Sequence, residues 1–330
     1  MAVPTSQVKL LNATGRLGEQ QPPPLKPPAE HLDRVCYFFG YPIAHSLSPA
    51  FHAALFSDLN LNYQQLLYET TSIEACMALT EDPKFLGASI TMPFKLAIMP
   101  YLDKLTPEGE AIGAINTVFL QTSSNGERLL CGTNTDCIGI REAIKQNADP
   151  VKVAEMKGKP AMIIGGGGTC RTAVYVLKRF FGCSEIYLAN RDKSEVDHVI
   201  SECMSRGLAD DLRYIASVAE ADCLEAPKVI VSAIPDLTPR TEEEITTRQI
   251  VEAILGKSEK GVLLEMCYHP VLNTEITAIG KTSGWQVIPG TEAMIWQGFE
   301  QGRVWLQRDL SSQTIEHVKD VVHSIIAKSH

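Results

Sequence analysis

The chain has 330 residues, 45% of them hydrophobic, and is therefore long enough for two domains that each bury a core. Its formal net charge of -9 argues against a nucleic acid or an anionic membrane as partner, because both attract basic patches. No apolar run approaches the roughly 20 residues of a membrane helix, and residues 1–21 lack the apolar stretch of a secretory signal. We therefore expect a cytoplasmic protein whose partner is a small molecule.

The nine cysteines follow no regular spacing and include no C-x-x-C pair. Such a distribution favours reduced structural thiols over a disulfide framework. It also gives no zinc-type signature, and we predict no metal site.

The first 34 residues form a segment of their own, with a proline-rich run at 22–28 and few apolar residues. This composition favours extended, unpacked chain and predicts a disordered tail at 1–34. A proline-rich ligand for a signalling module is the alternative.

From Val35 onward, short apolar runs alternate with segments of helical periodicity, which predicts an α/β fold with parallel strands and crossover helices. Two such blocks follow each other, at about 36–140 and 159–289, and two amphipathic helices follow at about 291–306 and 312–327. The sequence thus predicts two α/β domains that face each other across a cleft.

In the first block, residues 40–49 form a turn before a helix with an apolar face. Pro49 suits the first helical position, and Ser48 suits the cap. Ser46 adds a second hydroxyl, and two hydroxyls at a helix start can bind a carboxylate without supplying a full charge.

Residues 87–95 again lead from a strand into a helix, which we expect to begin at Pro93. Lys95 falls in the predicted first turn, where a cation opposes the helix dipole unless an anion or a reaction requires it. We therefore interpret Lys95 as functional, although an exposed surface lysine is the ordinary alternative.

Two glycine-bearing segments follow, at 113–117 with Asn116 and at 132–136 with Asp136. Asn and Asp in such loops usually serve turns, by hydrogen bonds to nearby backbone. Taken alone, each would remain a turn residue.

The second block opens with a buried strand at 161–164 that runs directly into Gly165, Gly166, Gly167 and Gly168, before a helix that starts at Thr169. Glycines between a strand and a helix N-terminus let backbone N–H groups approach a pyrophosphate, whose charge the helix dipole favours. A tight glycine turn without a ligand is the alternative.

The next strand, at 185–189, ends in Asn190, Arg191 and Asp192, where such a unit meets the adenosine ribose. Arg191 could pair with a 2′-phosphate, whereas Asp192 could accept hydrogen bonds from ribose hydroxyls. A carboxylate about 4 Å from a phosphate costs on the order of 4 kcal/mol at a surface-like dielectric, which favours NAD. Alternatively, Asp192 caps the helix that begins at Lys193 and faces away from the ribose.

Two further apolar strands, at 228–232 and 261–266, end on the same side of the sheet. Ligands of open parallel sheets lie beyond the carboxyl ends of the strands. We therefore expect Ser232, Ala233 and Ile234 to line the nicotinamide half of the crevice.

Together these segments resemble the shikimate/quinate dehydrogenase family, over about residues 36–306. The resemblance rests on H-S-x-S-P at 45–49, T-x-P-x-K at 91–95, A-x-N-T at 114–117, N-T-D at 134–136, the glycine run at 165–168, Tyr268-His269-Pro270, and residues 290–297 with Met294 inside. Within the family the chain looks like the stand-alone fungal quinate dehydrogenases, through Asn190-Arg191-Asp192 and the segment 265–270.

The resemblance implies that residues 35–141 and 291–330 form the substrate domain and that residues 142–290 form a Rossmann-type NAD domain. It implies a substrate carboxylate held by Ser46, Ser48 and Tyr268, with ring hydroxyls bound by Thr91, Asn116 and Gln297. Lys95 and Asp136 become the catalytic pair, and Gly290 and Met294 join the cofactor site.

Two residues depart from the family pattern: Asp192 stands where many NADP-using relatives have a small hydroxyl residue, and Glu265 stands where many have Asp. We therefore predict an NAD-dependent quinate dehydrogenase that also oxidises shikimate, with no oligomeric state implied. The alternatives are an NADP-dependent shikimate dehydrogenase and a non-catalytic sensor of quinate or NAD. Intact Lys95 and Asp136 and an acidic surface count against the sensor.

Overall fold

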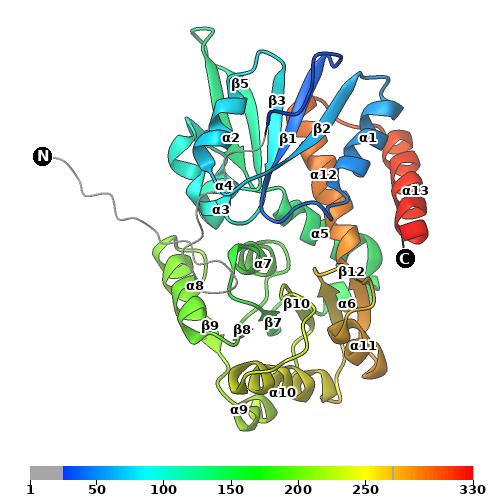
Figure 1. Ribbon diagram of the computed structural model, residues 1–330. Helices are drawn as coiled ribbons and strands as arrows, with labels where there is room; N and C mark the ends of the chain where they lie inside the picture. The colour runs from blue at the N-terminus through cyan, green and yellow to red at the C-terminus, as the bar shows by residue number, and fades with distance from the viewer. Residues whose placement is uncertain (1–24, 270, 330) are drawn as a thin grey trace, which may run out of the picture.

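The computed structural model describes residues 25–269 and 271–329, which form two lobes, each built around a six-stranded sheet (Figure 1). Most of the predicted tail, residues 1–24, and Pro270 lie outside the described residues. Within the rest of the predicted tail, Ala29 and Leu32 are buried in the core of the first lobe. Lys84 Nζ donates to the carbonyl of Leu32 at 2.7 Å, so the packed chain begins before Val35.

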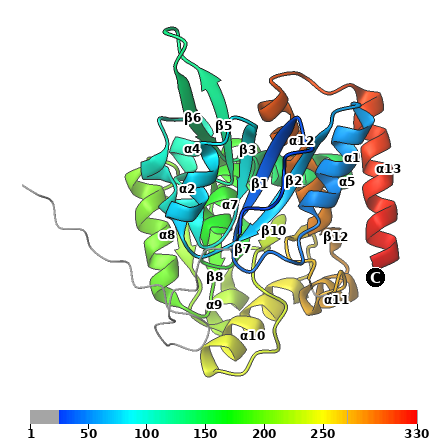
Figure 2. The same cartoon turned by 45° about the horizontal axis from the view of Figure 1, so that its top comes forward.

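The first sheet has the strand order β2-β1-β3-β5-β6-β4. Its strands are β1 (Arg34–Gly40), β2 (Tyr63–Glu69), β3 (Phe85–Ile90), β4 (Lys104–Leu105), β5 (Thr117–Thr122) and β6 (Arg128–Thr133). The sheet is mixed rather than wholly parallel, because β5 runs antiparallel to both β3 and β6. The two segments interpreted as glycine-bearing loops are thus the base of a hairpin, which projects from the lobe in Figure 2.

The second sheet is parallel throughout, with the order β12-β11-β10-β7-β8-β9. Its strands are β7 (Ala161–Ile164), β8 (Ile186–Ala189), β9 (Leu212–Tyr214), β10 (Val229–Ser232), β11 (Val262–Glu265) and β12 (Gln286–Pro289). Every residue of β7, β8, β10 and β11 is buried, as helices on both faces require. The strand order reverses between β7 and β10, which is where such sheets bind ligands.

The helices cover both sheets and connect their strands (Figure 1). They are α1 (Ser48–Asp58), α2 (Ile73–Thr80), α3 (Phe94–Ala97), the 3-10 turn η1 (Met99–Tyr101), α4 (Pro107–Ile112), α5 (Asp136–Asn147), α6 (Pro150–Ala154), α7 (Gly168–Arg179), α8 (Lys193–Ser205), α9 (Val218–Cys223), α10 (Glu242–Gly256), α11 (Glu275–Thr282), α12 (Gly290–Leu306) and α13 (Ser312–Ser329). The α/β class with two lobes is confirmed, and the last two helices agree closely with the predicted ones. Among the described residues, none of these helices is long and apolar enough to span a bilayer.

Helices α5 and α12 lie side by side between the lobes. They pack so closely that a Cβ at Gly139 would stand 2.4 Å from the carbonyl oxygen of Ala293. Further along α12, Trp305 Nε1 donates to the carbonyl of Val118 in the first sheet at 3.0 Å. The chain therefore returns from the second lobe to pack on the first, and α12 carries its polar side chains to the space between them.

Candidate active site

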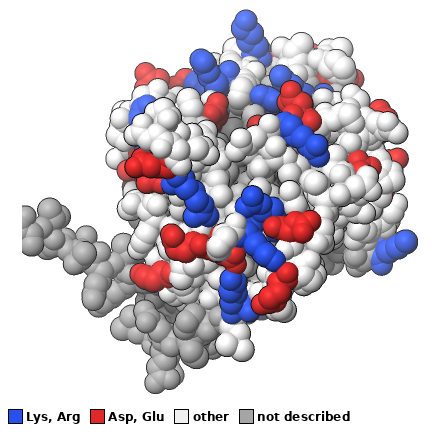
Figure 3. Space-filling view, turned by 90° about the horizontal axis from the view of Figure 1, so that it is seen from above, with Lys and Arg blue, Asp and Glu red and all other residues white. Residues whose placement is uncertain are grey.

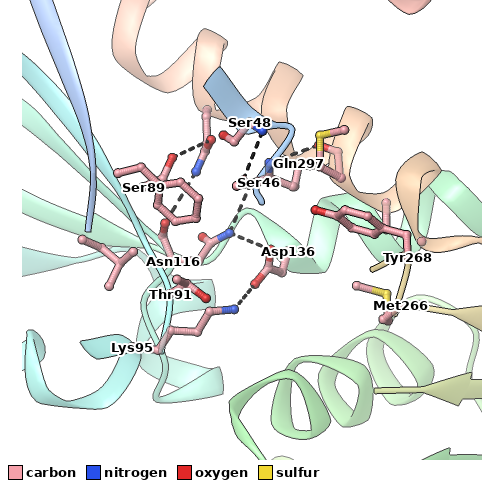
Figure 4. A pocket seen from close by; sticks show the side chains of 16 residues that line it. Ser46, Ser48, Ser89, Thr91, Lys95, Asn116, Asp136, Met266, Tyr268 and Gln297 are labelled. Atoms are coloured by element: carbon pink, nitrogen blue, oxygen red, sulfur yellow. Dashed lines mark hydrogen bonds and ion pairs between the residues drawn. The ribbon is translucent and has the colours of Figure 1, made fainter. Parts of the chain in front are cut away.

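A cavity between the lobes collects polar side chains from both (Figure 4). All eight residues predicted for substrate binding and catalysis line it: Ser46, Ser48, Thr91, Lys95, Asn116, Asp136, Tyr268 and Gln297. The sequence interpretation did not include Ser89, Met266 and Gln301, which line it as well.

Lys95 and Asp136 form an ion pair in the wall of this cavity, with Nζ 2.6 Å from Oδ2. Their side chains are 17% and 16% exposed, so the pair is largely shielded but reachable from the cavity. Asp136 is the first residue of α5, where the helix dipole stabilises a carboxylate. The helix-dipole premise for Lys95 does not hold, because α3 is a single turn with little dipole to oppose. The lysine nevertheless has an anion as partner, Asp136.

Asn116 fixes Asp136 from the other side. Its Nδ2 donates to Asp136 Oδ1 at 2.8 Å, while its Oδ1 accepts from the backbone N–H of Thr135 at 2.7 Å and from the hydroxyl of Thr117 at 2.9 Å. These bonds tie the start of β5 to the start of α5. Asn116 and Asp136 thus act together across the hairpin base instead of serving separate turns.

Ser46 and Ser48 lie at the start of α1, but Ser48 is not the cap. Leu47 occupies the cap position, and its apolar side chain makes no cap bond, whereas Ser48 is already the first helical residue. Ser46 Oγ accepts from the N–H of Ser48 at 3.2 Å. The Ser48 hydroxyl is buried and has no hydrogen-bond partner among the described residues. A buried polar group is almost always paired, so this hydroxyl is one that a ligand in the cavity would satisfy.

Tyr268 reaches the cavity from the second lobe, opposite Lys95 and Thr91 (Figure 4). Burial and then the charge of Asp136 raise the pKa of Tyr268 to about 12, so its hydroxyl is a donor at neutral pH. A hydroxyl donor from one lobe therefore faces the lysine and threonine of the other.

Gln297 and Gln301 lie one turn apart on α12, and both line the cavity. Gln297 Oε1 accepts from Thr135 Oγ1 at 3.2 Å, and Gln301 Nε2 donates to Thr117 Oγ1 at 3.0 Å. Gln301 Oε1 also accepts from Ser89 Oγ at 3.1 Å. The spacing of four residues was the available sequence signal for Gln301, since it places both glutamines on one helix face.

The glycine turn after β7 has the shape that a dinucleotide requires. Gly165 has a φ of +133°, which a side chain would strain, and a Cβ at Gly166 would stand 2.7 Å from Asn190 Nδ2. Gly167 is the N-cap of α7, and a Cβ added there would meet no atom of the described residues within 4 Å, so the turn is open on this side. The Cβ direction of Gly168 points to Lys95 Cδ at 3.8 Å, while Thr169 follows it in the first turn of α7. Gly168, the first residue of α7, therefore lies beside Lys95.

The residues predicted to meet the ribose, Asn190, Arg191 and Asp192, follow the C-terminal end of β8. Asn190 Nδ2 donates to Glu195 Oε2 at 2.7 Å, and Arg191 pairs with Glu244. Asp192 caps α8, because its Oδ1 accepts from the N–H of Ser194 at 2.8 Å. Capping was the alternative interpretation of Asp192, and its hydrogen bonds to Ser194 lower the pKa of the carboxyl, which stays charged at neutral pH.

The three residues after and at the end of β10 that were expected to line the nicotinamide half of the crevice differ in burial. Ser232 is fully buried beneath the surface, whereas Ala233 and Ile234 continue past the strand end. From α12, Met294 lines the cavity, and a Cβ at Gly290 would stand 2.4 Å from the Met266 carbonyl oxygen. Gly290 is thus required by close packing of α12 on β11, in addition to any role toward a cofactor.

Glu265, at the end of β11, is a buried acid behind this edge. It is 1% exposed, and its Oε1 accepts from the N–H of Cys267 at 3.0 Å. Burial raises the pKa of Glu265 to about 7. Among the described residues, no group of three or more His, Cys, Asp and Glu side chains is placed to hold a metal ion.

Comparison with known proteins agrees with this geometry. Residues 38–118 match the family described as the shikimate dehydrogenase substrate binding domain. The chain is 41% identical to a quinate dehydrogenase from Emericella nidulans over 314 residues, which cover 90% of this chain and 95% of the relative.

Two solved structures have the same fold. Dehydroquinate dehydratase and shikimate dehydrogenase from S. pombe AroM is 29% identical with a TM-score of 0.71, and the match covers 88% of this chain and 53% of that one. Shikimate 5-dehydrogenase from Thermus thermophilus in complex with NADP(H) and shikimate is 28% identical with a TM-score of 0.66, over 87% of this chain and 99% of that one. The chain belongs to the shikimate/quinate dehydrogenase family.

Proposed function

We propose that the chain oxidises a ring hydroxyl of quinate to give 3-dehydroquinate, with NAD as the hydride acceptor, and that shikimate is a second substrate. The observation that carries the proposal is the Lys95–Asp136 pair in a cavity that also holds the unpartnered hydroxyl of Ser48. A proton-transfer group and a carboxylate-binding hydroxyl in one cavity suit a small hydroxylated acid. The 41% identity to a quinate dehydrogenase supports the same substrate class.

In this proposal the two ends of the cavity bind different parts of the substrate. Ser46, Ser48 and Tyr268 donate hydrogen bonds to its carboxylate, and their hydroxyls add no competing negative charge because Tyr268 stays protonated. Thr91, Asn116 and Gln297 bond the ring hydroxyls. The substrate is thereby oriented with one carbinol group next to Lys95.

Lys95 in its neutral form would take the proton of that hydroxyl. A nicotinamide held beside the glycine turn would supply the hydride acceptor. Asp136 holds the resulting ammonium at 2.6 Å, and Asn116 holds Asp136. Before the transfer the pair carries the single negative charge of Asp136. After it the ammonium and the carboxylate neutralise each other, which stabilises the protonated lysine. The same groups return the proton when the reaction runs backward.

We assign residues 35–141 and 291–330 to the substrate domain and residues 142–290 to the cofactor domain, with Tyr268 reaching the substrate from the cofactor domain. The fit of the cofactor rests on the turn at Gly165 to Gly168, whose open side at Gly167 admits a pyrophosphate to the N-terminus of α7. NAD is favoured over NADP by Asp192, which remains a charged carboxylate beside the ribose position although it also caps α8. This differs from the Thermus thermophilus relative, which was solved with NADP(H).

A cytoplasmic location and a small-molecule partner complete the proposal. All nine cysteines are free thiols, as is usual in a reducing compartment. On the face in Figure 3, acidic and basic side chains are interspersed, and this face has no continuous basic field to attract nucleic acid or an anionic membrane.

The test is to incubate the full chain with quinate and NAD, to follow reduced cofactor by absorbance, and to identify the product by NMR. We expect equal amounts of reduced cofactor and 3-dehydroquinate, and loss of both in Lys95→Met at an unchanged thermal midpoint. Absence of turnover with quinate and with shikimate, using either cofactor, would overturn the proposal.

A further inference from the structure

An ion pair joins two elements of the second lobe at the edge of the proposed cofactor site. Arg191 follows β8, and its Nη1 donates to Oε1 of Glu244, which lies in the first turn of α10. The arginine side chain is 59% exposed and the glutamate side chain 22% exposed. Arg191 is the residue that would otherwise be available to a phosphate on the adenosine ribose.

Glu244 is held in place by the helix start that it belongs to. Its Oε2 accepts from the backbone N–H groups of Arg240 at 2.9 Å and Thr241 at 3.2 Å, and its own N–H donates to Thr241 Oγ1. This is a capping box, in which one carboxylate oxygen satisfies the helix start and the other remains for Arg191. These hydrogen bonds lower the pKa of Glu244, so it is ionised at neutral pH.

Further acids follow Arg191 in the same segment. Asp192 follows it in sequence, and Glu195 reaches back toward the glycine turn, where its Cβ would lie 2.8 Å from a Cβ at Gly166. Lys193, the neighbouring cation, is paired with Asp197 one helical turn away, with Nζ at 2.6 Å from Oδ1. A phosphate group here would meet a guanidinium already engaged by a carboxylate.

We infer that Glu244 is a cofactor-specificity residue, which occupies Arg191 and thereby excludes a ribose 2′-phosphate. The inference rests on the proposed binding of a nicotinamide dinucleotide and adds to Asp192 a second, sequence-distant acid. Glu244 acts through Arg191, so its effect depends on the arginine. A ribose with two free hydroxyls carries no charge to compete with Glu244 and is unaffected.

The experiment is a titration of the full chain with NADH and with NADPH, followed by the fluorescence of the reduced nicotinamide. Glu244→Gln keeps an oxygen for the capping bonds and removes the charge. We expect it to lower the Kd for NADPH about tenfold, equivalent to roughly 1.4 kcal/mol, and to leave the Kd for NADH nearly unchanged. Glu242→Gln is the matched control, because it removes the same charge from the same turn without taking the acceptor from Arg191.

The second arm repeats Glu244→Gln in an Arg191→Leu background, where the gain for NADPH should disappear. An unchanged ratio of the two Kd values in Glu244→Gln, or the same gain without Arg191, would overturn the inference while leaving the proposed function intact. Failure of the unmodified chain to bind either dinucleotide would overturn the proposed function and the inference with it. Equal thermal midpoints of the variants exclude a merely structural effect.

Discussion

Lys95 Nζ lies 2.6 Å from Asp136 Oδ2, although 41 residues separate the two in sequence. The contact joins the turn after β3 to the start of α5, and Asn116 at the start of β5 completes it. Lys95 follows β3, Asn116 precedes β5 and Asp136 follows β6, so three strand ends of the mixed sheet place the proton-transfer residues on one side of the cavity.

Removing either member of this unit should abolish most activity without unfolding the chain. We expect Lys95→Met and Asp136→Asn each to lower kcat about a hundredfold to ten-thousandfold, the usual contribution of a positioned acid or base. Because the residues act as a unit, the double variant should be little worse than either single one. Steady-state kinetics check this, with Lys104→Met as an exposed-lysine control; additive losses in the double variant would contradict a coupled pair.

Ser48 offers a test of carboxylate binding that is separate from catalysis. Its hydroxyl makes no hydrogen bond within the described protein, so Ser48→Ala should leave the thermal midpoint unchanged. Loss of a hydrogen bond to a charged substrate group should raise KM for quinate by about tenfold or more. Ser57→Ala, on the same helix and exposed, is the control. The assignment fails if the KM penalty for the methyl ester of quinate is as large as that for quinate.

A substitution at Gly167 can test cofactor binding without disturbing the fold. Gly167 has an extended conformation, with φ -91° and ψ -165°, and no atom of the described part of the chain lies within 4 Å of an added Cβ. Gly167→Ala should therefore fold normally but weaken NADH binding by about tenfold or more, since the methyl group blocks backbone approach to a pyrophosphate. Gly256→Ala, which also has open space, is the control, and equal NADH affinity of the two variants would speak against a cofactor at this turn.

Glu265 predicts a specific pH dependence of stability. Its pKa is raised from 4.5 to about 7 in the folded chain, so the folded state binds the proton more tightly than the unfolded state. The stability contributed by the protonated acid is fully present below about pH 4.5 and is lost as the pH rises through 7, by roughly 3 kcal/mol.

Glu265→Gln keeps the acceptor for Cys267 and cannot ionise. Its free energy of unfolding, relative to that of the unmodified chain, should therefore rise between pH 5 and pH 8 in urea titrations. Glu252→Gln, exposed on α10, should show no such change. Parallel stability curves for Glu265→Gln and the unmodified chain would show that the buried carboxyl does not titrate in this range.

The sequence pattern predicted the structure correctly where the residues of one short segment determine its conformation. The run from Ala161 to Gly168 encodes a buried strand, a glycine turn and a helix start in eight residues, and the structure has all three. The fully buried strands of the second sheet were readable for the same reason, because parallel strands covered on both faces are continuously apolar.

Features that depend on distant residues were not readable in this way. The hairpin of β5 and β6 has its glycines and asparagines at its base, where they resemble loops, and only the pairing of Thr117 with Thr133 reveals the sheet. The cap of α1 shifted by one residue to Leu47, a change within the ordinary uncertainty of helix ends. Glu244 meets Arg191 across 53 positions, and no local signal links them.

The most direct test of the account is a comparison of kcat/KM for the four pairs of quinate or shikimate with NAD or NADP, measured from the absorbance of the reduced cofactor. The account predicts the highest kcat/KM for quinate with NAD, measurable turnover of shikimate with NAD, and low values for both substrates with NADP. A preference for shikimate with NADP would contradict it, because Arg191 would then bind the 2′-phosphate in spite of Asp192 and Glu244.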